Sequence, residues 1–278
     1  MKIRIADLPA EFVKYFSLIT GCLIAFVPLL VIFLSSFKTQ QEFYESPVLS
    51  LPSNIFNFAN YVSAFVSGKM LEGFFNTTII MLVSCAGTII IGSMTAYVLS
   101  RFNFKFNRLV GTLFLLAALI PAVSTQVATF QIVEGLGLFN TMWSNIILFV
   151  GTDIISVYIF LQFLNGIPTD IDEAALMDGA SFFRIYTSII FPLLKPAIAT
   201  VLIIKMVAFY NDFYTPFLYM PDKDLGVIST ALFRFIGPFS AQWHVICAGI
   251  VITIIPTLIV FLFLQKYIYN GLIQGAVK

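Results

Sequence analysis

Long apolar stretches alternate with shorter polar connections along the chain. Six stretches reach the length of about 20 residues that a helix needs to cross a bilayer; they cover 15–36, 76–99, 109–130, 142–165, 193–214 and 243–265. Each contains Gly, Ser, Thr or Pro among larger apolar residues, and small residues let membrane helices approach one another closely. The pattern predicts an all-α, polytopic membrane protein with six transmembrane helices in one domain, 1–278.

The composition supports this prediction. Hydrophobic residues make up 59% of the 278 residues and charged residues 10%, against about 45–50% and about 25% in soluble domains. A net charge of +1 provides no basic surface for nucleic acid. Cys22, Cys85 and Cys247 lie in apolar stretches without metal-like spacing, so no metal site is expected. Soluble, disordered and nucleic-acid-binding classes are therefore excluded.

The positive charges predict the orientation. Ten Lys and Arg side chains fall in the termini and connections on one side of the predicted bundle, and four fall on the other side. Because positive charge accumulates on the cytoplasmic side, both termini are expected in the cytoplasm. Two external connections, 37–75 and 215–242, are long, and 131–141 is short.

The cytoplasmic connection 166–192 has organised polarity. Pro168 and Thr169 mark a helix start, and acidic residues follow in the first turn, where the helix dipole favours them. Gly179 permits a turn that other residues resist, and an amphipathic stretch, 181–190, comes next. Two short helices along the membrane surface are predicted. They fit either an interfacial loop with acidic caps or a docking element for a cytoplasmic partner.

The same connection resembles the EAA motif of the permease subunits of binding-protein-dependent ABC importers. Glu173–Ala175 are followed by Gly179 and then by Ile189–Pro192 at the motif's spacing. The family pattern ends in Ile-x-Leu-Pro, and Phe191 takes the place of Leu in this chain. The match covers 20 residues and lies in the loop before the fifth predicted helix.

The resemblance extends over most of the chain and narrows the family to carbohydrate-uptake permeases. The matching runs are Ser36–Thr39, Asn60–Val62, Asn76–Thr78, Ala96–Tyr97, Ser100–Phe102 and Asn211–Phe213. Tyr210 stands where relatives usually have Trp, so a contact that relatives make through this Trp is not assigned to the present chain. The C-terminal run Gly271–Lys278 is similar to the tail of MalG-like subunits and distinguishes the chain from their MalF-like partners.

This resemblance implies a permease of the ABC type I importer fold with a cytoplasmic coupling helix, located in a bacterial or archaeal cytoplasmic membrane. The implied partners are a MalF-like second permease, two ABC ATPase subunits that bind ATP and Mg²⁺, and an extracytoplasmic solute-binding protein. The chain contains no GxxxxGK[ST] loop, so it is expected to bind no cofactor and to catalyse no reaction. The implied substrate is a carbohydrate, an oligosaccharide in the first instance, and a glycerol-phosphate-type solute stays open.

The resemblance also implies roles for individual residues. Those implied to couple to an ATPase are Glu173, Ala174, Ala175, Asp178, Gly179 and Pro192. Those implied to reach between the ATPase subunits are Gly271, Gly275 and Lys278. A solvated, frayed end is the alternative for this tail.

Four polar residues lie at membrane depth or near helix ends: Asp153, Lys205, Asn211 and Asp212. Ionisable groups at such depth usually face a cavity or a partner. Lys205 and Asp153 lie at similar depths in two predicted helices, so an ion pair, a contact with transported solute and snorkelling of Lys205 all remain open. An ion pair would also fit a proton-coupled secondary transporter, which leaves the EAA-like loop unexplained. No catalytic constellation is visible, which disfavours a membrane enzyme.

Overall fold

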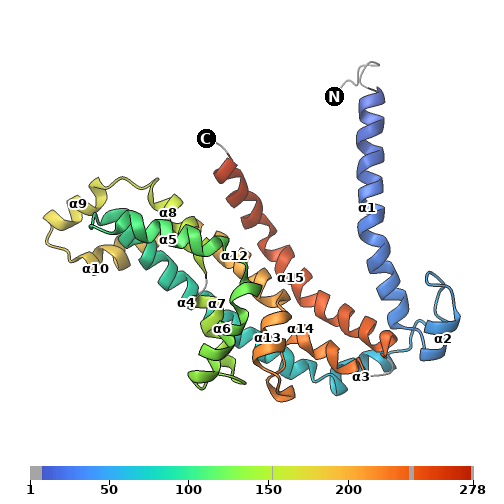
Figure 1. Cartoon of the computed structure of the whole chain (residues 1–278). Coiled ribbons are helices and arrows are strands. Elements are labelled where there is room, and N and C mark those ends of the chain that lie inside the picture. Colours follow the sequence, from blue (N-terminus) through green and yellow to red (C-terminus); the bar gives the residue numbers. More distant parts are fainter. Residues whose placement is uncertain (1–7, 152, 238–240, 277–278) are drawn as a thin grey trace. The chain divides into compact units, whose positions relative to one another are not determined.

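The computed structural model describes residues 8–151, 153–237 and 241–276 (Figure 1). Helices provide its regular structure, apart from an isolated bridge between Ile236 and Ala241. The α-helices are α1 (Leu8–Ser36), α2 (Gln40–Glu45), α3 (Ala59–Ser67), α4 (Met70–Arg101), α5 (Asn107–Leu119), α6 (Ala122–Gly135), α7 (Met142–Gly151), α8 (Ile154–Leu164), α9 (Asp170–Met177), α10 (Phe182–Ile185), α11 (Phe191–Leu193), α12 (Lys195–Asn211), α13 (Tyr214–Tyr219), α14 (Ile228–Ala231) and α15 (Trp243–Ala276). Tyr186–Ile190 form a π-helical turn, and Lys223–Leu225 and Leu232–Phe235 form 3₁₀ turns.

The chain divides into two compact units. The first unit comprises Met1–Leu71 and Ala231–Ile259, and the second unit comprises Glu72–Thr230 and Val260–Lys278. The helices α1, α2 and α3 and most of the apolar part of α15 belong to the first unit. The second unit contains nearly all of α4 and the helices from α5 to α13.

Three uninterrupted helices in the described residues are long and apolar enough to span a membrane: Glu11–Ser36, Met70–Arg101 and Trp243–Leu262. Three bent helix pairs also qualify if each pair forms one span, which gives up to six crossings. The prediction of six apolar spans is therefore compatible with the structure, in which three of the six are bent helix pairs.

The predicted helix 109–130 is broken between α5 and α6 by a bend of 106°. Ile120 has an extended backbone, with ψ of 120°, and precedes Pro121. Proline lacks the backbone N–H needed inside a helix, and its ring drives the preceding residue out of helical geometry. Membrane helices tolerate proline, but here the residue ends one helix and begins the next.

The predicted helices 142–165 and 193–214 are also interrupted. In the first, α7 and α8 meet at a bend of 41°, and Asp153 caps the new helix by accepting a hydrogen bond from the Ser156 N–H. The second is shorter than expected: α12 is bent by 71° from the helical segment Phe182–Leu193. Pro196 fits the first turn of α12 because its missing N–H removes no helical bond there.

Three helices are longer than expected. The structure extends α1 back to Leu8, and α4 runs over 32 residues from Met70 to Arg101. The last helix does not end at residue 265; α15 continues to Ala276. The predicted tail is therefore helical over its described part.

The first unit is organised around Lys38, which is only 2% exposed. The Lys38 ammonium donates to Ser46 Oγ, Ser50 Oγ and the Pro47 carbonyl at 3.0–3.1 Å. The Asn60 side chain donates to the carbonyls of Ser36 and Lys38, at 2.8 Å each. The sequence predicted Lys38 to lie in an external connection between membrane spans. Its side chain is nevertheless buried, because the oxygen atoms around its ammonium group compensate for the loss of water.

The second unit has its main apolar core where α4, α8, α9, the π turn and α12 meet. The most buried members are Ala96, Phe160, Leu164, Ile185, Ile190, Leu194, Ala197 and Val201. Gly92 of α4 faces Phe160, and an added Cβ would lie 3.4 Å from its ring. Close contact at this glycine lets α4 pack directly on α8.

Candidate functional site

The connection 166–192 folds into two short helices joined at a sharp turn, as predicted (Figure 1). The first is α9, with Asp170, Asp172 and Glu173 in its first turn. Gly179 follows with φ of +79°, a region that costs residues with a Cβ about 1–2 kcal/mol. Ser181 then caps α10 by accepting a hydrogen bond from the Arg184 N–H. We call residues 170–185 the elbow.

The elbow presents a mixed polar and apolar surface. Glu173, Ala174, Asp178 and Gly179 are exposed, and Met177 is 88% exposed. The surface therefore combines small residues, carboxylates and an apolar side chain that a second surface can contact.

Two of the residues assigned to coupling lie apart from this surface. Ala175 is only 8% exposed and packs in the core of the second unit. Pro192 is exposed in the first turn of α11, beyond the π turn. The two alanines of the motif thus differ: Ala174 faces outward, whereas Ala175 lets α9 lie close to its own chain.

Asp172 connects the elbow to the end of α4. Its carboxylate lies 3.1 Å from Arg101 Nε and accepts a hydrogen bond from the Tyr97 hydroxyl at 3.2 Å. Arg101 also donates to the Ile167 carbonyl at 2.8 Å. Both charged side chains are about nine-tenths buried, at 9% and 11% exposed. Sequence reasoning treated Asp172 as a helix-cap acid and Arg101 as a topology charge, so it missed this pair.

The second half of the elbow is tied to α4 by Tyr186. This residue begins the π turn, and its hydroxyl lies 2.8 Å from Ser93 Oγ. The Tyr186 ring also packs against the Tyr97 ring, with centroids 5.5 Å apart. Both arms of the elbow are therefore attached to one face of α4.

Lys205 and Asp153 form an ion pair within the second unit. The Asp153 side chain is 3% exposed and that of Lys205 is 13% exposed. Asp153 also caps α8, so it joins α12 to the break between α7 and α8. Of the alternatives left open by the sequence, this geometry matches the ion pair.

Asn211 and Asp212 make local contacts at the end of α12. The Asn211 side chain donates to the Val207 carbonyl in its own helix. The Asp212 carboxylate accepts bonds from the backbone and hydroxyl of Thr215, at 3.0 and 2.7 Å. Both residues thus shape the turn between α12 and α13.

In the predicted tail, Gly271 and Gly275 lie within α15, and Lys278 lies outside the described residues. Among the described residues there is no group of three or more His, Cys, Asp or Glu side chains that could hold a metal ion.

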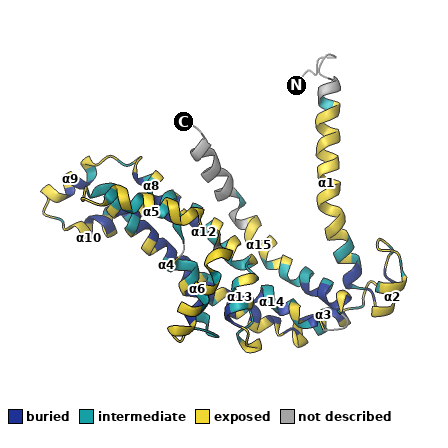
Figure 2. Cartoon of the chain, viewed as in Figure 1, coloured by how far each residue is buried: buried dark blue, intermediate teal, exposed yellow. Residues whose placement is uncertain are grey.

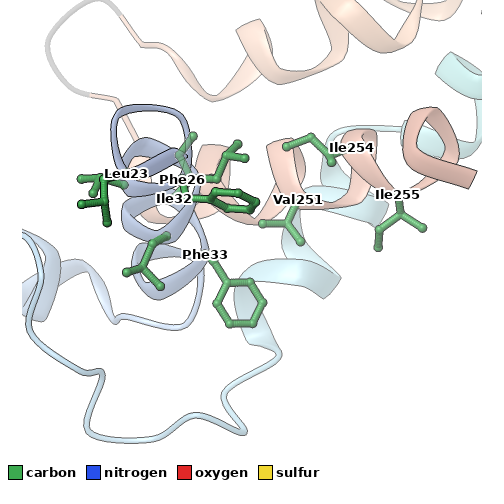
Figure 3. Close-up of a pocket in the computed structure, with 10 residues that line it drawn as sticks. Leu23, Phe26, Ile32, Phe33, Val251, Ile254 and Ile255 are labelled. Atoms are coloured by element: carbon green, nitrogen blue, oxygen red, sulfur yellow. The ribbon is translucent and has the colours of Figure 1, made fainter. Parts of the chain in front are cut away.

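The first unit carries an apolar groove between α1 and α15 (Figure 3). Its volume is about 480 Å³, and all ten lining residues are apolar; Phe26, Phe33 and Ile254 are among them. Every side chain from residue 12 to residue 30 is exposed, as the colouring of α1 shows (Figure 2). A groove of this kind suits a lipid chain or another helix, and it offers no hydrogen bonds to a polar solute.

Comparisons with known proteins agree with this architecture. Residues 88–274 match the family described as "Binding-protein-dependent transport system inner membrane component". The chain is 34% identical to the probable starch degradation products transport system permease protein AmyC of Thermoanaerobacterium thermosulfurigenes over 90% of this chain and 91% of that protein. It is 32% identical to the melibiose/raffinose/stachyose import permease protein MelC of Bacillus subtilis, with 91% of each chain covered.

Two further similarities support the same grouping. The diacetylchitobiose uptake system permease protein NgcG of Streptomyces coelicolor is 30% identical over 94% of this chain and 87% of its own length. A chain from the crystal structure of a bacterial ABC transporter involved in the import of the acidic polysaccharide alginate superposes with a TM-score of 0.83. That match covers 96% of this chain and 99% of the other at 21% identity, and it shows the fold.

Proposed function

The chain belongs to the family of binding-protein-dependent transport system inner membrane components, and we propose that it is a permease subunit that moves an oligosaccharide into the cell by alternating access. The named relatives are permeases for starch degradation products, for melibiose, raffinose and stachyose, and for diacetylchitobiose. These names favour a saccharide over a phosphorylated polyol. The transport energy comes from partner ATPase subunits, which bind ATP and Mg²⁺.

The observation that carries this proposal is the exposed surface of the elbow. Glu173 and Asp178 offer carboxylates, and Ala174 permits close approach beside the exposed Met177. Carboxylates make strong hydrogen bonds with basic groups. The elbow therefore fits a cleft on a cytoplasmic ATPase subunit, with Gly179 setting its angle and Pro192 leading toward α12.

The remaining partners follow from other surfaces. The exposed face of α1 and the groove beside α15 support a MalF-like second permease. The connections 37–75 and 215–242 lie outside the cell and receive a solute-binding protein. Both termini lie in the cytoplasm, where α15 carries Gly271 and Gly275 toward the ATPase subunits; Lys278 follows them in the sequence.

The first test is co-purification. The tagged chain is extracted from its native membrane in mild detergent, and the proteins that accompany it are identified by mass. We expect a second permease of similar size and an ATPase. Recovery of the chain alone, with uptake that survives ATP depletion, would instead support an ion-coupled carrier and refute the importer.

Two charge reversals locate the docking surface. Glu173→Lys is expected to abolish recovery of the ATPase while the second permease is retained. Glu134→Lys makes the same change at an exposed residue in the last turn of α6 and serves as the control. Normal ATPase recovery and transport by Glu173→Lys would show that the elbow is not the docking element.

A further inference from the structure

The end of α4 opposite the elbow holds a second segment of the chain. Asn76 donates through its side-chain amide to the carbonyls of Asp224 and Gly226, at 3.1 Å each. The Thr77 hydroxyl accepts a hydrogen bond from the Ile228 N–H at 2.9 Å. Asn76 and Thr77 are both about 5% exposed. Two adjacent buried side chains thus fix the backbone of residues 224–228 to the first turns of α4.

The two anchored regions lie at opposite ends of one helix (Figure 1). At about 1.5 Å per residue, the distance along α4 from Asn76 to Arg101 is about 37 Å. This exceeds the hydrocarbon core of a bilayer, which is about 30 Å thick. Arg101 and Tyr97 hold the elbow at one end, and Asn76 and Thr77 hold residues 224–228 at the other.

The form of α4 suits it to carry a displacement between these ends. It is continuous over 32 residues and contains no proline. The other candidate spans among the described residues of Glu72–Thr230 are bent pairs, with bends of 106°, 41° and 71°. A bent pair can absorb movement at its break, because breaks are where helices flex. A continuous helix moves as one body.

We propose that α4 mechanically links the elbow to the segment 224–228, so that docking of the binding protein outside the cell and ATPase closure inside it favour one another. Arg101, Tyr97, Asn76 and Thr77 are its positioning residues. The inference rests on the proposed function and extends it, because it adds α4 to the moving parts. The motifs around residues 76–78 and 96–102 thereby gain a physical role.

The test measures ATP hydrolysis by the complete importer in lipid nanodiscs, with and without its solute-loaded binding protein. The readout is the ratio of stimulated to basal hydrolysis. Asn76→Ala is expected to lower this ratio by about fivefold or more, the lower end of typical coupling between distant sites, although residue 76 lies across the membrane from the ATPases. Tyr97→Phe, which removes only the hydroxyl bonded to Asp172, is expected to lower it in the same direction.

Matched controls separate coupling from folding. Thr78→Ala removes an exposed hydroxyl that bonds only within α4, to the Phe74 carbonyl. Arg108→Met removes an exposed positive charge in α5. Both controls should keep the parental ratio. If Arg101→Met fails to assemble, Arg101→Lys retains the charge and is expected to restore part of the ratio.

The outcomes distinguish the inference from the proposed function. Parental stimulation in Asn76→Ala and Tyr97→Phe, alongside its loss in Glu173→Lys, would overturn the role of α4 and leave the importer standing. Failure of the parent chain to assemble with any ATPase would refute the proposed function itself. Loss of stimulation in Asn76→Ala and in Tyr97→Phe, with assembly intact and Thr78→Ala normal, supports the link.

Discussion

Replacing Lys205 with Met should reveal how strongly the second unit depends on its ion pair with Asp153. Both side chains are mostly buried, with exposures of 13% and 3%. Removing one partner of a buried pair typically costs about 3–5 kcal/mol, because the other charge remains desolvated. Lys205 retains slight exposure, so we expect the lower end, about 3 kcal/mol.

The reciprocal change can be made without removing the helix cap. Asp153 accepts the Ser156 N–H at the start of α8, and Asn caps helices about as well as Asp. Asp153→Asn therefore removes the charge and keeps the cap, and its expected cost is similar to that of Lys205→Met. The double variant Lys205→Met with Asp153→Asn leaves no unpaired charge and should recover to within about 1 kcal/mol of the parent.

The assay is thermal denaturation of the purified chain in one detergent, with the amount of inserted protein measured in parallel. Ile204→Met is the control, because Ile204 is 44% exposed and neighbours Lys205 in α12. A double variant no more stable than the single variants would refute the mutual pairing. Unchanged stability of Lys205→Met with transport lost would show that Lys205 serves the solute.

Three further predictions concern separate parts of the chain. Lys38→Met removes the ammonium that binds Ser46, Pro47 and Ser50 oxygens. The variant should leave these acceptors unsatisfied and lower the free energy of unfolding by about 1–3 kcal/mol. Limited proteolysis of residues 40–58 should be faster than in the parent. Hydrogen bonds from the Ser53 side chain and then from the Thr39 N–H lower the pKa of Glu42 from 4.5 to about 2. Its stabilising contribution is therefore present above pH 4.5 and lost toward pH 2, and the melting temperatures of parent and Glu42→Gln should converge over that interval. Gly179→Ala should lower the melting temperature more than Gly179→Asn, because Asn tolerates φ of +79° better than Ala does. An added Cβ meets no atom within 4 Å, so a steric clash does not account for the difference. Equal shifts in melting temperature for the two variants would contradict this explanation.

Local signals in the sequence were sufficient for the elbow. Acids in the first turn, a glycine at the turn and a second amphipathic run each act within a few residues, and the structure shows α9, the positive φ of Gly179 and α10 at these places. The buried pair of Asp172 with Arg101 joins residues far apart in sequence. Hydrophobic periodicity and helix propensity describe only residues that are close in sequence. They could not reveal this contact, and Asp172 was therefore interpreted as an ordinary acidic residue at a helix start.

The helix breaks show a different limit. The sequence stays apolar on both sides of Pro121 and of Asp153. A search for apolar stretches of membrane-spanning length therefore joins two helices into one at each of these positions. The local chemistry was nevertheless visible: proline removes a helical N–H, and Asp is among the residues preferred at a helix N-cap. The proline rule alone is not sufficient, because Pro28 lies inside α1 and Pro256 lies inside α15 without ending either helix.

These breaks also determine which helix can act as a lever. Pro121 separates α5 from α6, Asp153 starts α8, and Pro196 lies in the first turn of α12, so the helices packed around α4 each contain a place to bend. Gly87 of α4 has no side chain to separate it from α7, and a Cβ there would lie 2.8 Å from Val150 Cγ2. In the proposed link, a displacement of α4 is passed to these neighbours, which bend at their breaks to follow it. Among the described residues of Glu72–Thr230, the positions of Pro121, Asp153 and Pro196 thus distinguish the bent helix pairs from the continuous helix α4.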